Sequence, residues 1–324
     1  SSYADYRPVL QAASRAFLGK PAFPAGSWDE MSGWLVPDRP GPTNFEPDTV
    51  QGTGLLVLRP SNIPTWAYLR AAHFTDRPGH ADQLHLDLWW RGWNIAGDAG
   101  TILYNASPPW NNALARTAAH NTLVVAGQDQ MTHAGRFLWL DRAQAKVLEY
   151  QSVPVNNNIW AVAQHDGYRK MGLIHRRKVG WDGTGWLVED EVFAQAGQPS
   201  NRMISVSMHW LLPDCTWQLL TETPLSMRLQ TPAGWVNMNI ETTAGEELEP
   251  GQVSMQLARA GQLVFGDGQV EPTSGWRSHT YGYKEPALSF RYGLRGQLPL
   301  RLTTRWDFLP IITPHPPMQA ALTN

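Results

Sequence analysis

The chain lacks several features that mark whole classes of protein. Its 324 residues contain one cysteine, Cys215, which excludes an intramolecular disulfide framework and leaves the redox compartment undecided. The formal net charge is -2 and basic residues form no cluster, so the sequence predicts no nucleic-acid or membrane partner. No apolar run has membrane-spanning length, and the first 23 residues do not have the pattern of a secretory signal.

The residues that are present describe a globular protein with a sizeable core. Hydrophobic residues make up 42% of the chain and charged residues 17%. Residues 1–20 carry apolar side chains at helical spacing, and Gly19 and Pro21 end that helix. Because one lone helix needs a partner surface, we expect the chain to begin in the middle of a longer protein.

The remainder of the sequence is dominated by strand signals. Residues 21–48 are predicted to be a connector, residues 49–312 a β-domain and residues 313–324 a tail. The β-domain has about a dozen short β-rich runs between turn residues and almost no helical period, which predicts the all-β class and a large antiparallel β-sandwich. The predicted strands lie at residues 53–60, 65–74, 84–92, 120–127, 159–166, 173–182, 185–193, 203–212, 225–230, 236–241, 262–267 and 288–294.

Three possible metal ligands lie close together in the β-rich part of the sequence. They are His80, Asp98 and His120, and two imidazoles with one carboxylate suit a zinc-like ion that keeps one coordination position open. Glycines flank Asp98 and allow a sharp backbone turn. By spacing alone, three hydrogen-bonded polar residues buried in loops remain the simpler explanation.

Other polar residues of the same region are predicted to be structural. His85 and Asp87 alternate with leucines in a predicted strand, which favours a solvated or cross-strand polar pair over metal ligands. The block from His165 to Tyr168 contains Asp-Gly, a hairpin turn signal, and His175 follows it closely. Both groups therefore have a structural interpretation.

Aromatic residues are abundant and include 16 tryptophans, most of which we expect in the core. Trp110, beside two asparagines in the loop between the possible ligand motifs, is the best candidate for a platform on which a sugar ring stacks. Tyr104 is predicted to face substrate as a phenolic donor. A strand-end tyrosine with a satisfied hydroxyl is the alternative for that residue.

Four sequence blocks occur in the order found in one known family. They are GHADQLHLDLWWRG, AGDAGTILYN, ARTAAHNTLVVAGQDQ and AQHDGYRKMGLIHRRKV. Together they resemble the heparinase II/III-like polysaccharide lyases, including the oligo-alginate lyases, strongly over residues 70–195 and by pattern elsewhere. In that family an α/α toroid precedes a C-terminal antiparallel β-sandwich, and the cleft between them holds a uronic-acid polysaccharide. The chain resembles the second half, which makes residues 1–20 the helical remnant of a missing toroid.

The resemblance also implies a cofactor. The histidine of the family's His-Ala-Asp motif, the aspartate of its Asp-x-Gly-Thr motif and the histidine of its His-Asn-Thr motif bind zinc. In this sequence these positions are His80, Asp98 and His120. The zinc is expected to be mainly structural, and Asp82 is expected to orient His80 or Arg77.

One departure from the family pattern affects the expected chemistry. Two positions before His80, heparinase-type members often carry a histidine, whereas this chain has Pro78. The motif looks more like that of the oligo-alginate lyases, in which case Arg77 would pair with a substrate carboxylate in bidentate fashion.

The resemblance implies cleavage of a uronic-acid polysaccharide by β-elimination. A base removes the weakly acidic C5 proton, the 4-linked sugar leaves, and the enzyme neutralises the adjacent carboxylate. In the family the base and the acid come largely from the toroid, so we expect the isolated chain to be inactive. A periplasmic or extracellular location follows by analogy.

Two other functions remain open at this stage. One is a non-catalytic carbohydrate-binding or scaffold sandwich. The other is a zinc hydrolase, which has no signal of its own here, such as a His-Glu-x-x-His helix.

Overall fold

The computed structural model describes residues 5–35, 54–155, 158–242 and 251–310. The chain forms two compact units, residues 1–50 and 51–324. The predicted tail and part of the predicted connector, residues 36–48, lie outside the described residues. Within the described ranges no helix is both long and apolar enough to cross a membrane.

The first unit is helical. Its elements are α1 (Arg7–Leu18), the 3-10 helix η1 (Ser27–Asp29) and α2 (Glu30–Leu35). Gly19 takes a left-handed conformation at φ 65° and ends α1, as the sequence predicts. The buried Gln11 side chain accepts hydrogen bonds from the backbone N–H groups of Ala22 and Phe23 and donates one to Asp29. Part of the predicted connector therefore folds back onto the helix.

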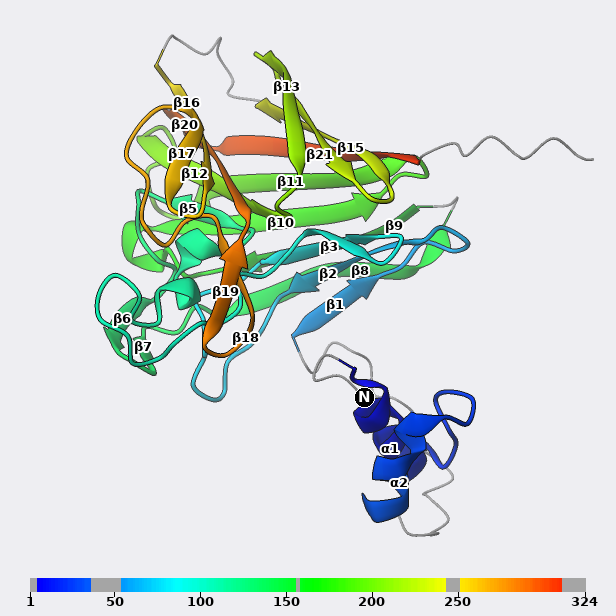
Figure 1. Cartoon of the computed structure of the whole chain (residues 1–324). Coiled ribbons are helices and arrows are strands. Elements are labelled where there is room, and N and C mark those ends of the chain that lie inside the picture. The colour runs from blue at the N-terminus through cyan, green and yellow to red at the C-terminus, as the bar shows by residue number, and fades with distance from the viewer. Residues whose placement is uncertain (1–4, 36–53, 156–157, 243–250, 311–324) are drawn as a thin grey trace, which may run out of the picture. The chain divides into compact units, whose positions relative to one another are not determined.

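The second unit is an antiparallel β-sandwich, which confirms the predicted fold class (Figure 1). Its largest sheet has eight strands in the order β13-β14-β15-β21-β11-β10-β9-β8. These strands are β8 (Ala145–Val155), β9 (Asn158–His165), β10 (Leu173–Trp181), β11 (Gly185–Ala194), β13 (Thr216–Glu222), β14 (Leu225–Thr231), β15 (Gly234–Thr242) and β21 (Leu300–Pro310).

Two smaller sheets share a core with the large one. The five-stranded sheet has the order β17-β16-β20-β12-β5, and the four-stranded sheet has the order β1-β2-β3-β4. The five strands are β5 (Leu123–Val125), β12 (Met203–Leu212), β16 (Val253–Arg259), β17 (Gln262–Gly266) and β20 (Leu288–Gln297). The four strands are β1 (Leu55–Leu58), β2 (Thr65–Arg70), β3 (Leu86–Trp90) and β4 (Trp93–Ala96).

Several short elements lie outside these sheets. They are the hairpin strands β6 (Thr132–Gly135) and β7 (Leu138–Leu140), the hairpin strands β18 (Trp276–Thr280) and β19 (Tyr283–Pro286), and the 3-10 helices η3 (Ala113–Ala115), η4 (Thr117–Ala119) and η5 (Arg169–Met171).

Each of the twelve predicted strand runs overlaps a strand of the structure. The sequence reading missed others, among them the two edge strands β8 and β13 of the large sheet. Most side chains of β8 are exposed or half-buried, so its sequence has no clear apolar alternation. Edge strands are paired on one side only, and fewer of their side chains need to be buried.

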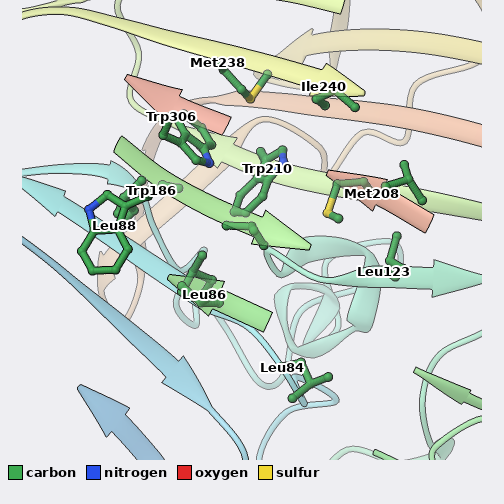
Figure 2. Packing of buried hydrophobic residues seen from close by; sticks show 14 of the residues in the cluster. Leu84, Leu86, Leu88, Leu123, Trp186, Met208, Trp210, Met238, Ile240 and Trp306 are labelled. Atoms are coloured by element: carbon green, nitrogen blue, oxygen red, sulfur yellow. The ribbon is translucent and has the colours of Figure 1, made fainter. Parts of the chain in front are cut away.

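The core fills the space between the sheets (Figure 2). Side chains of β11 alternate, and Trp186, Val188 and Val192 point inward from the large sheet. They join buried side chains of the smaller sheets, including Leu86 of β3 and Trp210 of β12, in one continuous hydrophobic cluster. The sheets therefore form a single packed body.

The inward face of the large sheet also carries charge. Arg177 of β10 and Asp190 of β11 occupy inward positions and are direct cross-strand neighbours. Both side chains are fully buried. This pair connects the sheet with the loops that hold the candidate site.

Candidate metal centre

The three predicted metal ligands come together in the structure. One ligand atom from each of His80, Asp98 and His120 lies within 4.8 Å of the others. The Nδ1 atom of His120 is 3.1 Å from Oδ2 of Asp98, and the rings of His80 and His120 have centroids 5.1 Å apart. The group therefore has the donor chemistry and the spacing of a metal site.

Asp98 lies just beyond the end of β4, in a turn that depends on glycine. Its Oδ1 atom accepts a hydrogen bond from the N–H of Gly100 at 2.6 Å. Gly100 has φ +71°, and a Cβ there would collide with the carbonyl oxygen of Ser278 in β18. The hairpin β18–β19 holds the segment after Asp98, because Ser278 N–H donates to the carbonyl of Ala99. The sharp turn predicted at Asp98 is thus present.

His120 follows η4 and leads into β5. Its side chain is completely buried, and its backbone is extended with φ -106° and ψ 155°. The Nε2 atom of His120 is buried and has no hydrogen-bond partner among the described residues. A buried ring nitrogen without a partner is uncommon, because such atoms are usually satisfied.

His80 belongs to the long loop between β2 and β3. The neighbouring backbone is fixed from two sides, since Ala81 N–H donates to the carbonyl of Ala115 and the Trp139 indole donates to the carbonyl of Gly79. The Nε2 atom of His80 lies 3.1 Å from the hydroxyl of Thr101. The ring is therefore held beside the turn that carries Asp98.

His85 is part of the same cluster, which the sequence reading missed. Its ring is buried and packs edge-on against His120 with centroids 5.3 Å apart. Its Nδ1 accepts a hydrogen bond from the N–H of Asn121, so Nε2 carries the proton and lies 3.7 Å from Asp98. The predicted polar pair with Asp87 is present, because Nε2 of His85 lies 3.6 Å from an Asp87 oxygen, but His85 is buried and not solvated. Leu84 has φ +58°, so strand alternation stops before His85.

Charges within the cluster change the pKa values of its members. About a third of the Asp98 side chain, 36%, is accessible. Desolvation would raise the pKa of Asp98, but attraction to His120 outweighs it and holds this pKa well below its usual range. Desolvation would lower the pKa of His120, and Asp98 reverses that effect and raises it. Desolvation, followed by repulsion from His120, lowers the pKa of His80.

The buried Arg177 joins the large sheet to the loops of the site. Its guanidinium makes a bidentate contact with Asp190, at 2.8 and 3.0 Å. Its Nη1 donates to two backbone carbonyls, those of Leu84 and Asn121, both at 2.6 Å. Leu84 immediately precedes His85, and Asn121 immediately follows His120. Arg177 therefore fixes the backbone at two points of the cluster.

A chain of histidines continues from Asp190. Gly167 N–H donates to Nδ1 of His165, so the Nε2–H of His165 donates to Nδ1 of His175 at 3.1 Å. His175 in turn donates from Nε2 to Asp190 at 2.6 Å. Burial is the first cause that lowers the pKa values of both histidines, and it holds that of His165 well below the usual range. Both histidines are buried and hydrogen-bonded inside the fold, which agrees with their structural interpretation.

The comparison with protein families gives a match over most of the chain. The family model described as "Heparinase II/III-like, C-terminal" matches residues 46–307, which is most of the chain. The chain belongs to the heparinase II/III-like family. The resemblance inferred from the four sequence blocks is thereby confirmed, whereas the oligo-alginate lyase variant stays a prediction. No curated protein matches the sequence.

Solved structures of heparinases show the same fold. A heparinase III structure is 17% identical in sequence, with a TM-score of 0.60, and the alignment covers 88% of this chain and 38% of the heparinase chain. The heparan sulfate lyase HepC from Pedobacter heparinus is 16% identical with a TM-score of 0.57, covering 87% and 39%. Another heparinase III structure is 17% identical with a TM-score of 0.54, covering 76% and 33%. This heparinase II/III-like chain thus spans 39% or less of the length of these three.

Two predicted site residues of the heparinase II/III-like motif lie around His80. The Asp82 carboxylate is 2.9 Å from Nε of Arg70 in β2, so its partner is Arg70 and not His80 or Arg77. Arg77 is exposed and has no ion-pair partner in the described part of the chain. Its guanidinium is therefore available to an external anion.

Two predicted aromatic residues lie in loops of the same domain. Tyr104 is 39% exposed and packs against Phe137 and Tyr281, with ring centroids 4.9 and 5.1 Å away. Trp110 has the ammonium of Lys284 3.3 Å from its ring centroid and Trp276 packed edge-on. Tyr104 therefore belongs to an exposed aromatic patch, whereas one face of Trp110 already holds a cation.

Removal of the Arg177 side chain should destabilise the fold strongly. In an Arg177→Met variant the Asp190 charge would remain buried without its main partner, and breaking such a pair costs about 3–5 kcal/mol. The neighbouring Arg176 is 39% exposed in its side chain, so Arg176→Met is a matched control with an expected loss of about 0–1 kcal/mol. Urea unfolding of both variants measures the difference. Equal losses would contradict the assigned role.

The buried histidine chain should make the fold sensitive to acid. Unfolded histidines bind protons below a pKa of about 6.5, whereas His165 stays neutral in the fold. Below this pKa the unfolded state binds more protons than the folded state. As the pH is lowered, the free energy of unfolding should therefore decrease by up to about 1.4 kcal/mol per pH unit for each such histidine. His165→Gln keeps an acceptor and a donor and should reduce this slope between pH 7 and pH 5. The exposed His279→Gln is the control, and an unchanged slope for His165→Gln would count against this account.

Proposed function

We propose that His80, Asp98 and His120 bind a divalent metal ion, and that the ion is zinc. Two imidazoles and one carboxylate, with a fourth position open, are a donor set typical of zinc. The buried Nε2 of His120, which has no partner among the described residues, supports this assignment, because a neutral ring nitrogen offers a lone pair to a cation. When bound, the ion would supply a cross-link between three loops.

We further propose that the chain is the β-sandwich part of a polysaccharide lyase that cleaves a uronic-acid polysaccharide by β-elimination. The observation that carries the proposal is the cluster of possible metal ligands in a heparinase II/III-like domain. Arg77, three residues before His80 and free of ion pairs in the described ranges, would bind and neutralise the substrate carboxylate. This neutralisation is what removal of the C5 proton requires.

The aromatic patch of Tyr104, Phe137 and Tyr281 would contribute to sugar binding. Exposed aromatic rings offer flat apolar surfaces, and Tyr104 adds a phenolic donor. Trp110 would offer only the part of its ring that Lys284 and Trp276 leave free. These groups would bind the polysaccharide but supply no positioned pair of base and acid, which we assign to an α/α toroid outside the chain.

The alternative function is a non-catalytic carbohydrate-binding domain. The aromatic patch favours it, because stacking on exposed rings needs no chemistry. By analogy with the family, either function would be periplasmic or extracellular.

Loss of two candidate ligands should abolish metal binding. A chain with His80→Ala and His120→Ala retains only the Asp98 carboxylate, whereas the wild-type chain is expected to hold about one ion. The exposed His279, paired with Glu285, provides His279→Ala as a control that keeps the site. Elemental analysis after purification and zinc titration of the stripped proteins both measure the effect. Equal metal content in wild type and double variant would refute the site.

The lyase proposal requires an activity assay on two forms of the protein. The 324-residue chain alone should form no unsaturated uronic-acid product from alginate or heparan sulfate. The chain together with any natural sequence that flanks it should form this product, and Arg77→Gln should lower the rate. Product from the isolated chain would contradict the assignment of base and acid. Binding of acidic oligosaccharides without product from either form would favour the binding domain.

A further inference from the structure

A cavity of about 410 Å³ lies next to the candidate metal centre but is not part of it. It opens on the face of the five-stranded sheet opposite the sandwich core, where His209 of β12 and Arg291 of β20 are cross-strand neighbours. The segments 109–119 and 271–276 line its other sides. Its volume lies in the lower part of the range of about 300–1,000 Å³ for ligand sites.

The guanidinium of Arg291 is the main cationic group from the sheet in this cavity. Its Nη2 donates a long hydrogen bond of 3.3 Å to the carbonyl of Ala118, and its Nε is buried without an acceptor among the described residues. No carboxylate of the described chain lies within 4 Å of it. Because buried donors are normally satisfied, a guanidinium with too few acceptors has capacity for an anion.

The rest of the lining suits a small polar molecule. Ser274, Thr273 and Asn111 offer hydroxyl and amide groups, and Trp276 offers part of an aromatic ring. Glu271 is the single carboxylate among the lining residues, and it is exposed. A second arginine of the lining, Arg116, is already paired with Asp129. The combination of one guanidinium without a carboxylate partner, several hydroxyl groups and an aromatic ring matches the chemistry of an acidic sugar.

The cavity and the metal centre share a wall. His209 donates from Nδ1 to the backbone carbonyl of His120 at 3.0 Å, and its Nε2 accepts a hydrogen bond from the hydroxyl of Ser289 at 2.8 Å. Ala99 and Ala119, which line the cavity, are the chain neighbours of Asp98 and His120. A ligand in the cavity would therefore contact the same backbone that positions two candidate ligands.

We propose that this cavity is a second binding site, which takes one carboxylate-bearing sugar residue and holds its carboxylate on Arg291. The volume restricts the ligand to a small molecule or one end of a chain. The choice of a uronic acid over another hydroxy acid rests on the proposed function. The binding itself needs neither the metal centre nor elimination activity.

Calorimetric titration of the chain with D-glucuronate tests the proposal, with D-glucose and sulfate as the comparison ligands. Glucuronate should bind more tightly than either, because only glucuronate carries both the carboxylate and the sugar hydroxyls. Equal binding of glucose would refute the role of Arg291. Equal binding of sulfate would refute a sugar site in favour of a simple anion site, and the absence of glucuronate binding would refute the site altogether.

Two variants with opposite expected effects on glucuronate affinity separate a loss of binding from a loss of folding. Arg291→Met should weaken glucuronate binding at least about tenfold, because a charge-assisted hydrogen bond is lost. Glu271→Gln removes a repelling charge at an exposed position and should tighten binding about two- to fivefold. Arg295→Met, an exposed position on the same face of β20, is the matched control and should leave affinity unchanged.

The variants also distinguish this proposal from the lyase proposal. Glucuronate affinity that is the same in wild type, Arg291→Met and Glu271→Gln would overturn the cavity site whatever the elimination assay shows. Glucuronate affinity that changes in the expected directions would support the site even if no form of the protein shows elimination activity. A melting temperature of Arg291→Met close to that of wild type shows that its lost affinity is not unfolding.

Discussion

The buried ion pair of Arg177 and Asp190 is the interaction on which the arrangement of the candidate site depends. Two charges inside a core cost several kcal/mol each unless their hydrogen bonds are complete. Here Asp190 receives three donors, two from Arg177 and one from His175. The Nη1 group of Arg177 donates to two backbone carbonyls in loops outside the strand ladders. The sheet thereby determines where irregular backbone lies.

A second buried group, the Asn121 side chain, extends this control. Its Nδ2 donates to the carbonyls of Leu86 and Gly97, and its Oδ1 accepts from the N–H of Leu211. Three segments distant in sequence are joined at one residue that directly follows His120. Loops carry most functional side chains in proteins, but loops need a rigid support to hold them at fixed distances. In this domain polar groups inside the core provide that support.

The sequence predicted the fold class and the His80, Asp98 and His120 cluster, because strand alternation and ordered motifs are local signals. It did not predict that His85 is buried, since the left-handed Leu84 ends the alternation and no side-chain pattern announces it. The hairpin that fixes the Asp98 turn is nearly two hundred residues away and could not be paired from sequence. Arg177 alternates with Val179 and Trp181, which indicates an inward position. A buried arginine is not expected in a core, however, unless the acidic residue that pairs with it is known.

The contacts of Asp98 and His120 also limit what a metal can contribute. Nδ1 of His120 already contacts one Asp98 oxygen at 3.1 Å, and the N–H of Gly100 donates to the other. A bound ion would replace part of this contact, so its effect on folding is the difference between the bonds gained and lost. Small zinc domains differ, because they have no comparable core without the ion. Two ring nitrogens would gain most from an ion. Nε2 of His120 has no hydrogen-bond partner in the described chain, and Nε2 of His80 has only the Thr101 hydroxyl within hydrogen-bond distance. A bound metal would therefore affect the position of these loops more than the sandwich.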